Sequence, residues 1–162
     1  LGDVYKRQAH IEPILEKEKT GLSVAFFAVA SDGTITVRKP NDYVSSMIEL
    51  AGGTYSLNGY VPEEENALST LKMQMEDFYA AEKDADILIY NGTIEGELTS
   101  IDELVQKNSL FADFKAVKTG QVYTTGSNFY QQTSGTCDFI EDLNKVLNGE
   151  TDAEYRFLKK IN

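Results

Sequence analysis

The sequence predicts an α/β fold, a three-layer sandwich lobe with a mainly parallel central sheet. Apolar runs at Leu22–Ala30 and Ala85–Tyr90 are typical of strands buried on both faces of a parallel sheet, and Gln121–Thr124 is predicted to form a third core strand. Amphipathic segments that fit helices alternate with these runs, as crossover helices alternate with parallel strands. A chain of 162 residues is long enough to bury one core of this kind.

Two short segments precede this α/β region. Residues 1–8, LGDVYKRQ, have no apolar periodicity and are expected to be a non-native leader, so that the natural protein extends further upstream. Residues 9–20 place Ile11, Ile14 and Leu15 on one side of a predicted helix, which has the pattern of the tail of a longer helix. The α/β region is therefore expected to span residues 21–162.

The first buried strand is expected to turn back at Ser31–Gly33 into a short β-branched strand, Thr34–Val37, at the edge of the sheet. Asn41 or Asp42 can then cap a helix that Gly52-Gly53 ends. The apolar face predicted for this helix consists of Tyr43, Val44, Met47, Ile48 and Ala51. These elements form the first half of the expected sheet and its covering helix.

The middle of the chain continues the alternation of strands and helices. A short strand is predicted at Tyr55–Leu57, and a helix at Met75–Glu82 leads into the buried strand that ends at Tyr90. Ser100 and Glu103 match a capping box, in which the hydroxyl accepts from the third amide and the carboxylate reaches back. A short helix is therefore expected from this point to residue 107.

The last third of the chain contains the clearest helical pattern. Leu110–Val117 should pack through its apolar side chains, before the third core strand. Asp138–Leu147 has one apolar stripe and is followed by Gly149, which fits a helix and its end. Thr151 and Glu154 suggest a second capping box, and so predict a terminal helix that carries Tyr155, Leu158 and Ile161.

Composition argues against several classes of function. Fifteen basic and 26 acidic residues give a net charge of −11, which repels nucleic acids and anionic lipid surfaces. The single His10 and the single Cys137 cannot supply a His-based triad, a multi-His metal site or a thiolate metal site. No GxGxxG or GxxxxGK[ST] pattern occurs, and no apolar stretch approaches the length of a membrane span. We therefore predict neither a cofactor nor a metal.

The best candidates for a binding site are loops that follow the strands, because ligands of open α/β sheets bind beyond the carboxyl ends of the strands. The loops at residues 30–39, 91–97 and 125–135 are rich in amide and aromatic side chains, and Arg can hold a carboxylate in a bidentate fork. Simple loop packing by Phe129 and Tyr130 is the alternative. The predicted ligand-binding residues are Arg38, Lys39, Asn91, Thr93, Tyr130 and Gln131.

Four segments, taken in order, carry a family resemblance. They are Ala51-Gly52-Gly53, Met75-Glu76-Asp77-Phe78, Asp84-Ala85-Asp86 before a strand, and Phe114–Tyr123 with its Ala-Val-Lys-x-Gly-x-Val-Tyr core. Over residues 9–150 the chain resembles the second lobe of periplasmic-binding-protein-like receptors for iron-siderophores, haem and cobalamin. The resemblance implies two α/β lobes joined by one long helix, with the ligand held between them. Residues 9–20 would end that helix, and residues 21–162 would form the carboxy-terminal lobe, with the amino-terminal lobe missing.

The resemblance also implies a function. It is that of an extracellular solute-binding protein of a bacterial ABC importer, which captures an iron-siderophore, haem or corrinoid-type ligand and delivers it to a permease and its ATPase. Such a protein is not an enzyme, and it is lipid-anchored at the cell surface or periplasmic. The alternatives are a small α/β enzyme, such as a hydrolase or nucleotide-dependent oxidoreductase, and a structural domain without a small ligand. The scarcity of catalytic motifs counts against the enzyme.

Overall fold

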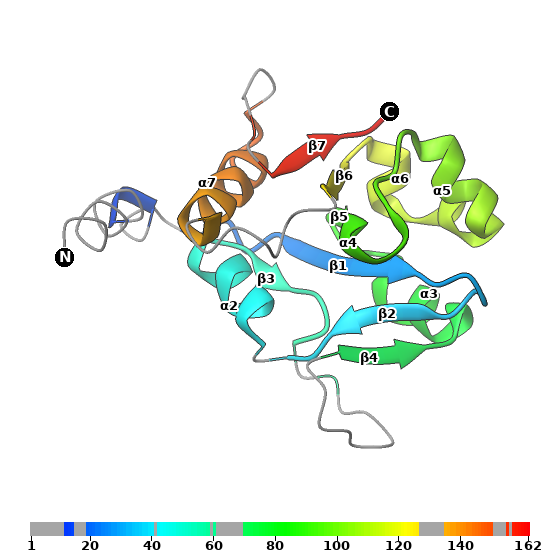
Figure 1. The fold of residues 1–162 in the computed structure, drawn as a ribbon. Coiled ribbons are helices and arrows are strands. Elements are labelled where there is room, and N and C mark those ends of the chain that lie inside the picture. Colours follow the sequence, from blue (N-terminus) through cyan, green and yellow to red (C-terminus); the bar gives the residue numbers. More distant parts are fainter. Residues whose placement is uncertain are drawn as a thin grey trace.

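The structure, a computed structural model, describes residues 12–14, 19–40, 42–58, 60, 70–126, 135–150, 155 and 157–162. Residues 12–14 are helical, within the segment expected to end a helix. The elements that follow are shown in Figure 1. They are β1 (Ser23–Val29), β2 (Ile35–Arg38), α2 (Tyr43–Leu50), β3 (Thr54–Tyr55), β4 (Thr70–Met73), α3 (Met75–Glu82), β5 (Ile87–Tyr90), α4 (Gly92–Glu95), α5 (Ile101–Lys107), the 3-10 helix η1 (Ser109–Asp113), α6 (Lys115–Thr119), β6 (Val122–Thr125), α7 (Gly135–Leu147) and β7 (Leu158–Lys160).

The sheet has parallel strands at its centre and antiparallel strands on both sides. Its strand order is β4-β2-β1-β5-β6-β7, and β3 pairs with the amino end of β1. The pairs β1–β3, β1–β5 and β5–β6 are parallel, whereas β1–β2, β2–β4 and β6–β7 are antiparallel. Helices flank this sheet (Figure 1), which confirms the predicted α/β class with a central sheet.

Strand β1 is buried on both faces, as its continuous apolar sequence predicts. Because successive side chains of a strand point to opposite faces, Phe26 and Phe27 enter two different halves of the core. Phe26 meets Phe139 of α7, with ring centroids 6.5 Å apart. On the other face Phe27 contacts Phe78 of α3 at 5.0 Å and Phe111 of η1 at 5.5 Å. The sheet therefore lies between two layers of helices.

The short strand predicted at Thr34–Val37 exists as β2, but the prediction that it lies at the edge of the sheet is wrong. Strand β4 pairs with β2 and forms the edge instead. Strand β4 contains only four residues, in which Leu71 and Met73 are buried and Lys72 is exposed. So short an alternation is a weak sequence signal, and it does not predict a strand. Tyr43 is also not part of the buried face of α2, since it is 48% exposed.

The predicted terminal helix is wrong, because residues 158–160 form the strand β7. The carboxylate of Asp142 on α7 accepts the backbone N–H groups of Phe157 at 2.7 Å and Leu158 at 3.2 Å. Ile161 then donates its N–H to Val122 of β6 at 3.0 Å. These contacts hold the segment extended against the sheet, which local sequence spacing does not reveal. The second capping box, at Thr151 and Glu154, lies outside the described residues.

One half of the first capping box, at Ser100 and Glu103, is confirmed, and the other half is wrong. The hydroxyl of Ser100 accepts the N–H of Glu103 at 3.1 Å, which confirms Ser100 as the cap of α5. The carboxylate of Glu103 accepts instead from Thr99, at 2.9 Å from its N–H and 2.5 Å from its hydroxyl. The hydrogen bond with the hydroxyl of Thr99 lowers the pKa of Glu103. The helix starts and ends as expected.

Candidate ligand-binding surface

The carboxyl ends of the three central strands meet at one edge of the sheet. Because the central strands are parallel and Phe27 of β1 pairs with Tyr90 of β5, the chain leaves both strands in the same direction. Asn91 donates its N–H to the carbonyl of Phe27 at 2.6 Å and is 5% exposed. Tyr90 pairs in turn with Thr124 of β6. This edge is where open α/β sheets bind ligands.

Asn91 and Thr93 are brought together at this edge as the cap of α4. The side-chain carbonyl of Asn91 accepts the N–H of Thr93 at 3.1 Å and the hydroxyl of Thr93 at 2.6 Å. Asn is among the preferred N-cap residues because its oxygen satisfies an otherwise free helix N–H. The two predicted site residues therefore order each other.

The turn into α4 packs tightly against the end of β6. Gly92 donates its N–H to the hydroxyl of Thr125 at 3.0 Å, and a Cβ at residue 92 would lie 2.2 Å from the carbonyl oxygen of Thr125. Only glycine allows this approach. The hydroxyl of Thr124 accepts the N–H of Leu98 at 3.3 Å. The buried threonines of β6 thus hold both sides of the loop that carries Asn91 and Thr93.

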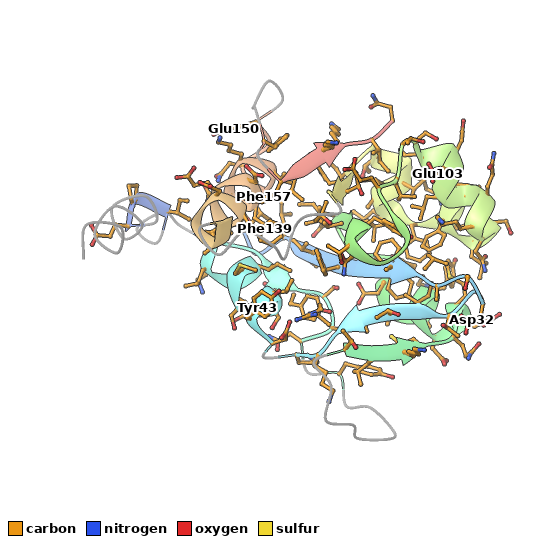
Figure 2. The ribbon with its side chains drawn as sticks, in the orientation of Figure 1. Asp32, Tyr43, Glu103, Phe139, Glu150 and Phe157 are labelled. Carbon is orange, nitrogen blue, oxygen red and sulfur yellow. The ribbon has the colours of Figure 1, made fainter. Side chains whose placement is uncertain are left out.

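Arg38 and Lys39 lie elsewhere, on the other side of β1. Strand β2 runs antiparallel to β1, so the chain leaves Arg38 toward the amino end of β1, whereas it leaves Asn91 toward the carboxyl end. Figure 2 shows Asp32 at the turn between β1 and β2, and Tyr43 on α2 toward the opposite end of β2. The structure therefore does not bring Arg38 and Lys39 together with Asn91 and Thr93. Tyr130 and Gln131 lie outside the described residues.

Arg38 is held by three neighbours. Its Nε donates to Oδ2 of Asp42 at 2.6 Å, and its guanidinium lies 5.0 Å from the ring centroid of Tyr43. Its backbone carbonyl accepts the hydroxyl of Tyr55 at 2.5 Å. The side chain is only 11% exposed. Asp42 also caps α2 through the N–H of Val44 at 3.2 Å, so Arg38 is tied to the start of that helix.

Two residues of this corner were not among the predicted site residues. Asp42 was expected only as a helix cap, and its second role depends on the bend that brings Arg38 beside it. Tyr43 was assigned to the apolar face, but it lies on the outer side of α2 and presents an aromatic ring to solvent next to a cation. We name Arg38, Lys39, Asp42 and Tyr43 the Arg38 corner.

The described parts of the chain contain no group of three or more His, Cys, Asp or Glu residues placed to hold a metal ion. In the same parts, no helix is long and apolar enough to cross a membrane. The Arg38 corner and the Asn91–Thr93 cap therefore offer charge, hydrogen bonds and one aromatic face. Groups of these kinds bind a preformed polar ligand.

Solved structures share this arrangement of elements, although no family model and no curated protein matches the chain. A TroA-like periplasmic binding protein, FepB from Veillonella parvula, superposes with a TM-score of 0.69 at 13% identity, over 99% of this chain and 54% of that chain. The siderophore periplasmic binding protein from the fuscachelin gene cluster of Thermobifida fusca superposes with a TM-score of 0.65 at 18% identity, over 91% of this chain and 53% of that chain. The chain has the fold of one lobe of a periplasmic binding protein.

A third likeness agrees with this lobe assignment. The periplasmic haem-binding protein HutB of Vibrio cholerae gives a TM-score of 0.64 at 13% identity, over 87% of this chain and 52% of that chain. The chain spans about half the length of each of these solved proteins. All three are named as binding proteins and not as enzymes. At such low identities the likeness shows the fold, and it does not transfer ligands or partners.

Proposed function

We propose that this chain is the carboxy-terminal lobe of an extracellular solute-binding protein of an ABC importer. The observation that carries the proposal is the shared fold, which covers nearly all of this chain and about half of each solved binding protein. In this proposal residues 21–162 form the lobe, residues 9–20 end a connecting helix, and residues 1–8 are a non-native leader. An amino-terminal lobe supplies the other half of the ligand site.

The proposed ligand is an anionic metal chelate of the iron-siderophore, haem or corrinoid type. From this lobe it would be contacted by Arg38 and Lys39 on one side of β1, by Asn91 and Thr93 on the other, and by Tyr130 and Gln131. The proposal therefore requires a flat or polydentate ligand that is wide enough to bridge these two groups. The exposed ring of Tyr43 adds a stacking face beside Arg38.

The proposed partners are a membrane permease and its ATPase, and the place of action is the cell surface, through a lipid anchor, or the periplasm. A delivery protein must release its cargo intact, so we propose that it performs no chemistry on the ligand. The test incubates the longer protein with ferric siderophores, haem and cobalamin. Saturable quenching of protein fluorescence with full chromatographic recovery of the ligand is expected, and this lobe contributes nine Tyr to that fluorescence. Turnover of any ligand would contradict the proposal.

Arg38→Ala is expected to weaken binding of the anionic ligand by about 1.5–3 kcal/mol, because it removes the charge-assisted hydrogen bond that Arg38 is proposed to make with the ligand. The side chain that makes this bond is mostly buried. Arg38→Lys should restore only part of the loss, since an ammonium cannot form the bidentate fork. Calorimetric titration of the longer protein measures both changes.

Asp42→Asn is the matched control for Arg38→Ala. Asn keeps the cap of α2 but removes the carboxylate that competes with the ligand for Arg38. Affinity should therefore stay the same or rise. If Arg38→Ala leaves the affinity unchanged, the guanidinium of Arg38 has only a structural role, and the proposed contact with the ligand is wrong.

A further inference from the structure

The carboxyl group of Glu82 lies inside the core of the lobe. Glu82 occupies the last turn of α3 and is 1% exposed. It shares a helical stripe with Met75 and Phe78, which are also buried, because residues three, four and seven apart lie on the same face of a helix. The packing of this stripe carries the side chain of Glu82 inward.

Neither carboxyl oxygen of Glu82 has a hydrogen-bond partner among the residues that the structure describes. The hydroxyl of Ser56, directly after β3, is buried and equally without a partner in these residues. It is close enough to Glu82 to favour the charged form, but it lacks the geometry of a hydrogen bond. Two unpaired polar groups buried side by side are costly, and a proton shared between them would satisfy both.

The charged and titratable groups around this contact do not offset a negative charge. Burial raises the pKa of Glu82 to about 7, and no cation in the described part of the chain lowers it. Tyr55, next to Ser56, has its pKa raised by its own burial and then by the charge of Glu82. Arg38 and Asp42 are paired with each other near the hydroxyl of Tyr55.

We propose that Glu82 is a neutral carboxylic acid in the folded lobe and that its proton draws the carboxyl group into a hydrogen bond with the hydroxyl of Ser56, so that the bound proton fastens α3 to the end of β3. Loss of this proton leaves a carboxylate in the core, which must draw in water or open the contact. Tyr55, adjacent to Ser56, holds the carbonyl of Arg38, so an opened contact also loosens the Arg38 corner. The contact itself is independent of the proposed function.

The direction of the pH effect follows from the two pKa values. The unfolded chain releases this proton near the ordinary pKa of 4.5, whereas the folded chain keeps it up to a pKa of about 7. The stabilisation is therefore complete below pH 4.5 and is lost as the pH rises through about 7. Between these limits the equilibrium constant for unfolding should rise on the order of a hundred-fold.

Urea unfolding of the chain at about pH 5 and about pH 8 tests this inference. The equilibrium constant for unfolding of the wild-type chain should be on the order of a hundred-fold larger at the higher pH. Glu82→Gln should remove most of this loss, because an amide cannot ionise but can still donate to Ser56. Glu76→Gln, an exposed position on the same helix, should keep the wild-type pH dependence.

A second measurement does not depend on a variant that folds. Carbon-13 spectra of the side-chain carboxyl groups in the wild-type chain should show one glutamate that titrates near pH 7. Its signal should be missing from Glu82→Gln if that variant is folded. The inference is overturned if all glutamates titrate at ordinary values, or if Glu82→Gln keeps the pH dependence of the wild-type chain.

Discussion

Phe27→Ala is expected to lower the free energy of unfolding by about 4 kcal/mol, the largest effect of any substitution considered for this lobe. Phe27 is fully buried and contacts the rings of Phe78, Tyr90 and Phe111 at centroid distances of 5.0, 5.6 and 5.5 Å. Its removal leaves a cavity among three elements that cannot all move inward. Denaturant titration followed by circular dichroism measures the loss.

Tyr43→Ala is the control for Phe27→Ala, because it removes an aromatic ring that is 48% exposed. It should cost no more than about 1 kcal/mol, chiefly from the lost contact with Arg38. Equal effects of the two substitutions would mean that Phe27 does not occupy the centre of the core.

Asp142→Ala is expected to lower the free energy of unfolding by about 3 kcal/mol. The carboxylate is buried and accepts the N–H groups of Phe157 and Leu158, so the substitution leaves two amides without this acceptor. Strand β7 should then separate from β6, which exposes Phe157, Leu158 and Ile161. Amide hydrogen exchange should show the loss of protection at β7 before other strands.

Asp113→Ala provides the comparison for Asp142→Ala, because Asp113 is an exposed carboxylate at the end of η1. Its effect on stability should stay within about 0.5 kcal/mol. If Asp142→Ala changes neither stability nor exchange at β7, the strand is held by its pairing with β6 and by its buried side chains, and the role given to the carboxylate is wrong.

The helices and strands with long, regular patterns could be predicted from the sequence. Strand β1 was recognisable because seven consecutive residues are suited to burial, and α7 because its apolar stripe spans more than two turns. Helix α3 was predicted with the boundaries that the structure has. In these segments local pattern and tertiary packing favour the same structure.

The errors fall where distant parts of the chain decide the structure. Residues 158–160 form a strand that is anchored at its start, where Asp142, sixteen positions before Leu158, accepts the backbone N–H groups of Phe157 and Leu158. Arg38 was placed in the same site as Asn91 because residues 30–39 were treated as one loop beyond the sheet, but they contain β2, which runs antiparallel to β1 and carries Arg38 away from that edge. How far a returning strand extends depends on its pairing with neighbouring strands, which a single sequence does not display.

The buried Glu82 could have been found in the sequence. It lies seven residues after Met75 and four after Phe78, on one face of the helix that was predicted there. A carboxylate on such a stripe conflicts with the apolar pattern, and conflicts of this kind tend to mark functional or strained positions. Its unpaired state, however, depends on β3 and could be recognised only in the structure.

The most direct test of the two-lobe account is a calorimetric comparison of this 162-residue chain with the longer polypeptide that contains it. Each is titrated with ferric siderophores, haem and cobalamin. The account predicts saturable binding of one of these ligands by the longer polypeptide and affinity weaker by at least about a hundred-fold for the isolated chain, because half of the contact surface is absent. Submicromolar binding by the isolated chain, or equal affinity of the two proteins, would contradict the account.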